Sequence, residues 1–180
     1  LFTKDFSFNK VIPIPENYQI VHGPVIEKAL ATYLTSFGRS NPQMMPGYYP
    51  IIVEMLQYAG ITIPEDFNNW FRECTANCDT ETWQRFYQLG YQYYENYKRT
   101  KTFTAVGFCG RFWGTPSDVI EVILHTTENT VGVVLTTLAK PPLPWLIVLS
   151  EMYPALSFII TIEDSNVIVT YKLHCGSLEK

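Results

Sequence analysis

Four cysteines and three histidines are the residues of this chain with the clearest capacity for chemistry. Three residues separate Cys74 from Cys78, which is not the spacing of a zinc knuckle, and no second Cys/His pair lies nearby in the sequence. His174 and Cys175 are adjacent, so on a strand their side chains would point to opposite faces. We therefore expect reduced thiols and no bound metal, with a Cys74–Cys78 disulfide as the alternative.

Cys109 has a different setting, because it precedes Gly110 and Arg111 and lies close to Trp113. A cation beside a thiol can lower its pKa and activate it as a nucleophile. No base is identified for it, however, and the glycines of this stretch have neither the dinucleotide nor the phosphate-loop spacing. The sequence thus predicts a protein that is not an enzyme and binds no cofactor. An enzyme built around Cys109, Arg111 and Trp113 is kept as a further alternative.

Tyrosines and basic residues gather between positions 81 and 113. Tyr91 and Tyr93 would lie about 200° apart on a helix of 3.6 residues per turn, so these tyrosines cannot all face one core. Because tyrosine, tryptophan and arginine often anchor interfaces, we predict a partner-binding surface here. Its residues are Tyr91, Tyr94, Tyr97, Arg99, Arg111 and Trp113.

Two other interpretations of the same stretch remain open. Aromatic rings interleaved with cations could stack nucleic-acid bases and contact phosphates. The cations concerned are Arg85, Lys98, Arg99, Lys101 and Arg111. The tyrosines could instead pack in a core while Lys98 and Arg99 complete a helix C-terminus.

Composition limits the partner classes. The chain of 180 residues is 47% hydrophobic and 17% charged, which is enough apolar material for a packed core. The formal net charge is -4, and neither half is basic, so bulk attraction to nucleic acid or anionic membranes is not expected. No apolar run approaches the roughly 18–20 residues that span a bilayer, and the first residues show no signal-peptide pattern. We expect a cytoplasmic protein with no membrane partner.

Helical periodicity dominates the first hundred residues. The predicted helices are 24–37, 48–58, 64–74 and 81–99. Gly38 and Gly60 are expected to end the first two, with a loop at 41–47 between them. Asp79 or Thr80 is expected to cap the last.

β-branched and aromatic residues dominate after position 103. The predicted strands are 119–125, 130–137, 158–163 and 167–173, with a turn at 164–166 and a helix at 144–153. Residues 6–12 are predicted to be extended at a sheet edge, because Pro13 and Pro15 cannot donate to a ladder. Residues 116–125 also fit a helix that begins after Thr115, although their β-branched side chains favour a strand. Residues 108–115 are expected to form a loop, and Trp145 to lie in the core.

The order strand, strand, helix, strand, strand in the C-terminal half is typical of an α+β protein of ferredoxin-like type. We predict a mainly helical region at 1–102 and a ferredoxin-like antiparallel sheet with helices on one face at 103–180. The helix 81–99 would be the first helix of that sheet. The two regions are expected to form one compact unit.

Three segments carry a resemblance to a known family. Residues 6–15 read FSFNKVIPIP, residues 113–115 read WGT, and residues 135–158 contain LTTLAKPPLPW, LSEMYP and Phe158. In this order they resemble the YubB-type proteins of phages, plasmids and genomic islands, which have a C-terminal ferredoxin-like domain of unknown function. Departures from the family pattern are Phe112, Pro116, Ser117 and Leu138, in place of asparagine, lysine and two tryptophans. The resemblance implies a ferredoxin-like fold and a mobile-element origin, and it implies no catalytic residue.

These observations lead to one functional hypothesis and one alternative. The first is a non-enzymatic accessory protein of a phage or plasmid that binds a host protein or protein–nucleic-acid complex, for example to inhibit a host defence system. It would act in the cytoplasm of the bacterial host. The alternative is a nucleic-acid-binding accessory module that uses the aromatic and basic residues.

Overall fold

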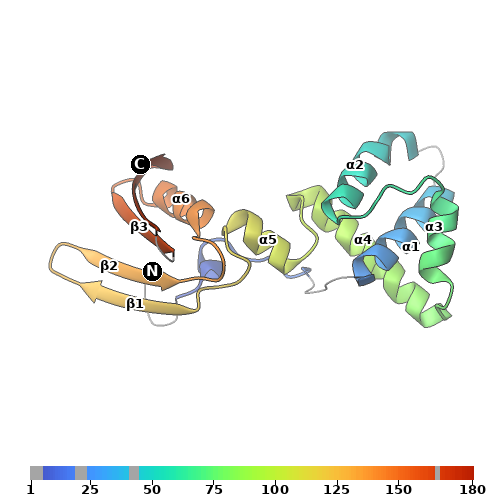
Figure 1. The fold of residues 1–180 in the computed structure, drawn as a ribbon, viewed down its shortest axis with the longest axis horizontal. Helices are drawn as coiled ribbons and strands as arrows, with labels where there is room; N and C mark the ends of the chain where they lie inside the picture. Colours follow the sequence, from blue (N-terminus) through green and yellow to red (C-terminus); the bar gives the residue numbers. More distant parts are fainter. Residues whose placement is uncertain (1–5, 19–23, 41–44, 165–166) are drawn as a thin grey trace. The chain divides into compact units, whose positions relative to one another are not determined.

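The computed structural model describes residues 6–18, 24–40, 45–164 and 167–180. The chain is α+β, with helices in its N-terminal part followed by two antiparallel sheets, and it forms two compact units. One unit is Asn17–Thr104, and the other joins the segment up to Glu16 with Ala105–Lys180 (Figure 1). The prediction divided the chain at residue 102 and grouped the N-terminal segment with the helices, whereas residues 6–16 pack with the strands. Within the described ranges, no helix is long and apolar enough to cross a membrane.

The unit Asn17–Thr104 consists of helices. Their bounds are α1 Pro24–Ser40, α2 Met45–Tyr58, α3 Phe67–Thr75 and α4 Thr80–Thr100. Asp79 caps α4 by accepting a hydrogen bond from the backbone N–H of Thr82 at 2.7 Å, as predicted. Gly38 does not end α1, which continues to Ser40, and α2 begins at Met45, inside the segment expected to be a loop. The remaining residues of that expected loop, 41–44, lie outside the described residues.

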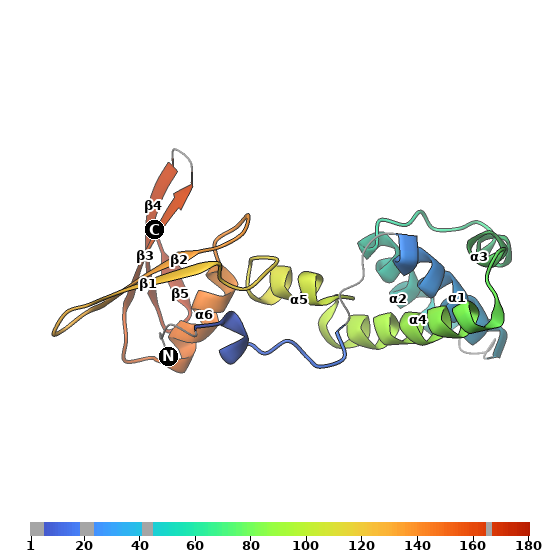
Figure 2. The same cartoon turned by 90° about the horizontal axis from the view of Figure 1, so that it is seen from below.

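α1 and α4 approach each other closely because of Gly90. A Cβ on Gly90 would lie 2.1 Å from the carbonyl oxygen of Ala29 and 2.6 Å from Cβ of Tyr33, so only glycine fits at this contact. The two helices lie side by side in Figures 1 and 2. The core around this contact is rich in aromatic rings, and its larger buried side chains are Leu30, Tyr33, Leu34, Ile52, Met55, Leu56, Trp70, Tyr93, Tyr94, Tyr97 and Phe103.

The second unit contains all the described strands. They are β1 Glu121–Thr126, β2 Val131–Thr136, β3 Phe158–Asp164, β4 Val167–His174 and β5 Ser177–Glu179. β1 pairs with β2 in one antiparallel sheet, and β3, β4 and β5 form another in that order. Figure 2 shows the β1–β2 and β3–β4 hairpins running in different directions. The predicted strands are confirmed, but a single ferredoxin-like sheet is not.

Alternation of side chains explains these hairpins. In β1 and β2, the half-buried Val122 lies opposite the half-buried Leu135, while Ile123 opposite Val134 is exposed. The strand interpretation of residues 116–125 is therefore correct from Glu121 onwards. The predicted turn at 164–166 lies mostly outside the described residues, since 165 and 166 are not described. β5 was not predicted, because three residues carry too little periodicity.

The second unit also contains three helical segments: η1 Phe8–Lys10, α5 Ala105–Phe112 and α6 Leu143–Met152. α6 confirms the predicted helix at 144–153. α5 corrects the expected loop for residues 108–112, whereas residues 113–115 lie beyond the helix and outside any strand, and it also corrects the β-rich interpretation of this stretch. Phe108 and Phe112 are one helical turn apart, with ring centroids 4.5 Å apart, whereas Gly107 and Gly110 weaken the helical pattern in the sequence.

The N-terminal segment is a 3₁₀ turn rather than an edge strand, which corrects the prediction for residues 6–12. The Asp118 carboxylate accepts hydrogen bonds from the Ser7 hydroxyl and from the backbone N–H of Phe8, the latter at 2.8 Å. Ser7 also caps the turn by accepting from the N–H of Asn9 at 3.1 Å. These bonds replace the ladder bonds of a strand, so side chains satisfy the backbone donors of Phe8 and Asn9.

Two tryptophans hold this segment in the core of the second unit. The indole N–H of Trp113 donates to the carbonyl oxygen of Ile12 at 2.9 Å, and that of Trp145 donates to the carbonyl oxygen of Phe8 at 3.1 Å. Trp145 is fully buried, as expected, and Phe6 packs edge-on against it. The three segments on which the family resemblance rests thus meet in one aromatic core. Packing in this core explains why the three segments stand out in the sequence.

Candidate binding surface on helix α4

The inward face of α4 is fixed by aromatic packing. Tyr33 of α1 contacts the rings of Tyr87, Tyr91 and Tyr94 at centroid distances of 5.5, 5.7 and 5.5 Å. Burial, and next the nearby Tyr94, raise the pKa of Tyr33 above its usual range. Burial likewise raises the pKa of Tyr93 to about 12. Tyr33 and Tyr93 therefore stay neutral at physiological pH and act as packing groups.

The C-terminal end of α4 is fixed by a polar network. The Tyr18 hydroxyl forms hydrogen bonds with Thr100 Oγ1 and, at 3.4 Å, with the carbonyl oxygen of Asn96. The Asn96 amide donates to the carbonyl oxygen of Phe103 at 3.0 Å, which ties the following segment to the helix. Because Tyr18 is held in this way, its neighbour Asn17 lies beside the outer face of α4.

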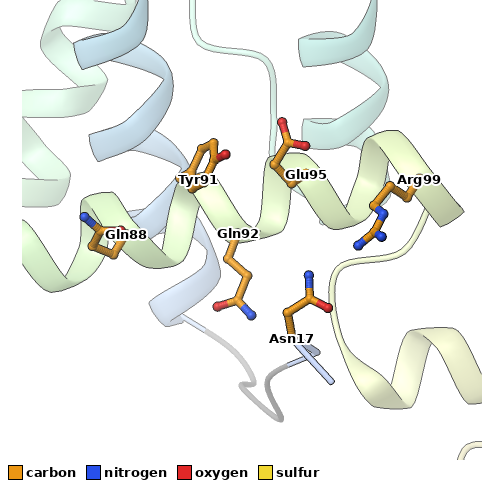
Figure 3. A pocket seen from close by; sticks show the side chains of 6 residues that line it. All are labelled: Asn17, Gln88, Tyr91, Gln92, Glu95 and Arg99. Atoms are coloured by element: carbon orange, nitrogen blue, oxygen red, sulfur yellow. The ribbon is translucent and has the colours of Figure 1, made fainter. Parts of the chain in front are cut away.

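Asn17 and α4 enclose an open hollow of about 580 Å³. Figure 3 shows Gln92 and Arg99 extending from α4 to the side on which Asn17 lies, while Tyr91 and Glu95 point to the other side. We call this feature the α4 hollow, and its lining residues are Asn17, Gln88, Tyr91, Gln92, Glu95 and Arg99. The four positions 88, 92, 95 and 99 follow helical spacing, so they share one face of α4.

The α4 hollow offers polar groups of every kind. Arg99 supplies five N–H donors, while Asn17, Gln88 and Gln92 each supply an amide donor and an acceptor. Glu95 is the one acid in the lining, and its carboxylate forms an exposed ion pair with Lys98 at 3.7 Å. Tyr91 is 48% exposed and adds an apolar ring with a hydroxyl. No ion pair or hydrogen bond of the Arg99 guanidinium is found among the described residues.

The structure separates the six predicted partner-binding residues. Tyr91 and Arg99 are exposed and line the α4 hollow. Tyr94 and Tyr97 are 5% and 6% exposed and belong to the core of the helical unit. Trp113, at 1% exposed, lies in the core of the other unit, whereas Arg111 is exposed there with its guanidinium 5.9 Å from the Phe112 ring.

Sequence reasoning missed Asn17, Gln88, Gln92 and Glu95. A stripe of polar residues at 88, 92, 95 and 99 could have indicated the exposed face of α4, because helical spacing is visible in the sequence. Asn17 had no such signal. Its place follows from the hydrogen bonds of Tyr18 to residues far along the chain.

The basic cluster near the end of α4 is largely occupied by other contacts. Lys101 pairs with Glu54 at 2.8 Å, and its ammonium lies 5.0 Å from the Tyr97 ring. Lys98 pairs with Glu95 and lies 5.6 Å from the Tyr94 ring. Each of these lysines therefore has an acid beside it that lowers its attraction for phosphate.

Cys109 does not have the features of an activated nucleophile. It is 3% exposed, and burial raises its pKa to about 11, with the charge of Asp118 acting in the same direction. The sequence predicts a thiol whose pKa Arg111 lowers, whereas burial shifts the pKa of Cys109 in the opposite direction. All four cysteines are free, so the Cys74–Cys78 disulfide is not formed. Across the described ranges, no three His, Cys, Asp or Glu side chains cluster as a metal site would require.

Comparison with known proteins identifies no relative. No protein-family model matches the chain, and no curated protein or solved structure matches it either. The resemblance to YubB-type proteins therefore stays a prediction.

Proposed function

We propose that this chain is a non-enzymatic binding protein whose α4 hollow contacts a protein partner. The observation that carries the proposal is that Tyr91 and Arg99, both exposed, line one hollow on α4 together with three carboxamides. Tyrosine and arginine are enriched among residues that dominate binding energy, and amides adapt to backbone groups of a partner. The aromatic contacts of the inner face hold α4 in place, so little order has to be gained on binding.

The partner that we propose is a macromolecule of a bacterial host, encountered in the cytoplasm, and the origin that we propose is a phage or plasmid. The role that we propose for this accessory protein is inhibition of a host defence system. The family resemblance supports this origin. It also supports a ferredoxin-like arrangement of the β1–β2 and β3–β4 hairpins. The mild negative charge suits a protein partner better than a nucleic acid.

The test begins with capture of partners from a bacterial lysate by the full chain. A captured protein is then purified, and its affinity for the wild-type chain is measured. Removing a central tyrosine or arginine from an interface costs at least about 1–2 kcal/mol, so Tyr91→Ala and Arg99→Ala should each weaken binding roughly tenfold. Arg72→Ala, an exposed arginine on α3, is the matched control and should leave the affinity unchanged.

Equal binding by wild type, Tyr91→Ala and Arg99→Ala would exclude the α4 hollow as the contact surface. The nucleic-acid alternative predicts instead a steep loss of oligonucleotide affinity with rising salt. The pairing of Lys98 and Lys101 with acids makes that alternative the weaker one. Oligonucleotide binding that depends steeply on salt and is lost in Arg99→Ala would favour it over a protein partner.

A further inference from the structure

A cysteine and a histidine form a close pair in the turn that follows β4. The sulfur of Cys175 lies 3.4 Å from Nε2 of His174, and both residues are exposed. The expectation that their side chains point to opposite faces is wrong. β4 ends at His174, and Cys175 has a left-handed backbone with φ of 46°, which turns its side chain back toward the imidazole.

The orientation of the imidazole suits a general base. Nδ1 of His174 lies 3.1 Å from the carbonyl oxygen of Leu156, and a carbonyl oxygen can only accept a hydrogen bond. In the neutral ring Nδ1 therefore carries the proton, and the lone pair of Nε2 faces the Cys175 sulfur, which also lies 3.5 Å from the carbonyl oxygen of Pro154. A nucleophile, a base within reach and a group that orients the base are the three parts of an activated thiol.

An open hollow of about 290 Å³ adjoins this pair. Its lining residues are Ser157, Lys172, His174, Ser177 and Glu179. Lys172 and Glu179 face each other across β4 and β5, yet among the described residues neither forms an ion pair. An ammonium and a carboxylate so placed could bind the carboxylates and the amino group of a small peptide.

We propose that Cys175 is a reactive thiol that undergoes exchange with small peptide disulfides, with His174 as its base. The other cysteines are less suited to this reaction. Cys109 is buried, and burial raises the pKa of both Cys74 and Cys109 to about 11. The pair is separate from the α4 hollow, so this proposal does not depend on the proposed function.

The reaction balances as a thiol–disulfide exchange. Nε2 of His174 takes the Cys175 proton, and the thiolate attacks one sulfur of the peptide disulfide. A bond forms between Cys175 and that sulfur, the original sulfur–sulfur bond breaks, and the other half leaves as a thiolate. His174 returns the proton to the leaving thiolate, so the products are a mixed disulfide on Cys175 and one free peptide thiol.

The experiment uses the full chain and oxidised glutathione as the probe. The rate of mixed-disulfide formation at each cysteine is followed by peptide mass spectrometry between pH 6 and 9. We expect Cys175 to react faster than the half-buried Cys78, and His174→Asn to slow Cys175 about tenfold at neutral pH. The difference between wild type and His174→Asn should be largest near neutral pH and narrow toward pH 9, where solvent hydroxide can take the thiol proton in place of the imidazole.

The control variants are chosen from the charged residues around the turn. Besides His174, they are Lys172, Glu179 and Glu151, whose carboxylate packs against Gly176. Lys172→Ala and Glu179→Ala should slow the reaction with oxidised glutathione several-fold and leave the rate with uncharged hydroxyethyl disulfide unchanged. Circular dichroism checks that each variant is folded.

Two results would overturn the proposal. If wild type and His174→Asn show the same rate at Cys175 at every pH, His174 is not its base. If Lys172→Ala and Glu179→Ala react with both disulfides as the wild type does, the hollow does not recognise a peptide disulfide.

Discussion

The contact between α1 and α4 predicts an unusual response to a glycine-to-alanine substitution. Alanine favours a helix over glycine by about 1 kcal/mol, so Gly90→Ala would stabilise α4 if propensity alone decided. The new Cβ, however, would lie 2.1 Å from the Ala29 carbonyl oxygen and 2.6 Å from Tyr33 Cβ. Contacts below 3.0 Å essentially never occur for real Cβ atoms, so the helices must separate by roughly 1 Å.

The magnitude follows from the two opposing terms. Overpacking of a core costs typically about 1–3 kcal/mol, and here the obstacles are a backbone oxygen and a Cβ, which cannot rotate away. A gap of this size also forfeits a quarter to a half of the dispersion energy of the separated atoms. After the helix-propensity gain is subtracted, we expect Gly90→Ala to lower the free energy of unfolding by about 2 kcal/mol.

Gly110 in α5 provides the matched control, because a Cβ there would meet no atom within 4 Å. Gly110→Ala should raise stability by about 0.5–1 kcal/mol, since only propensity changes. Urea unfolding followed by tryptophan fluorescence measures both variants, with Trp70 and Trp83 in the helical unit and Trp113 and Trp145 in the other. A Gly90→Ala variant as stable as the wild type would refute the close approach of the two helices.

Two further perturbations test the second unit. Trp145→Phe removes the indole N–H that donates to the Phe8 carbonyl oxygen, which keeps the bonds it accepts from the backbone N–H groups of Val11 and Ile12. Stability should therefore fall by about 1–2 kcal/mol in urea unfolding, through one lost hydrogen bond and the smaller ring in a buried site. Trp83→Phe, on the partly exposed part of α4, should change it little, and equal losses would contradict the argument. The raised pKa of Cys109 also makes a prediction for alkaline pH, where the unfolded thiol ionises before the folded one. The unfolded state then binds fewer protons, so stability should fall as pH rises from about 9 toward 11, by on the order of 2 kcal/mol. The fall should be smaller in Cys109→Ser, and an identical pH profile would show that burial does not perturb this thiol.

The sequence by itself determined the elements whose signals are local. The cap at Asp79 and the long helical periodicity after it predicted α4, because an N-cap bonds to backbone groups only a few residues away. The alternation of apolar and polar residues predicted β3 and β4, because successive side chains of a strand point to opposite faces and only one face packs inward. The helical spacing of the tyrosines also required that some of them be exposed on α4, and Tyr91 is exposed.

Local patterns did not decide which tyrosines those would be. Tyr94 and Tyr97 were predicted to bind a partner, yet they are buried because α1 and Phe103 cover that side of α4. Helical spacing places residues on faces, but it does not say which face a neighbouring helix will cover. The close approach permitted by Gly90 settles that choice for α4.

Only the tertiary structure brought together the groups that make the two candidate sites. Asn17 joins the α4 hollow because Tyr18 bonds to Asn96, 78 positions away. Phe8 is turned into η1 by Asp118, 110 positions away, although its sequence pattern favoured a strand. His174 and Cys175 face each other because the strand ends between them and the backbone reverses its sense. For Asn17 and Phe8, a hydrogen bond between distant residues decides the geometry. For His174 and Cys175, a single residue with a left-handed backbone decides it. Neither feature produces a periodic pattern in the sequence.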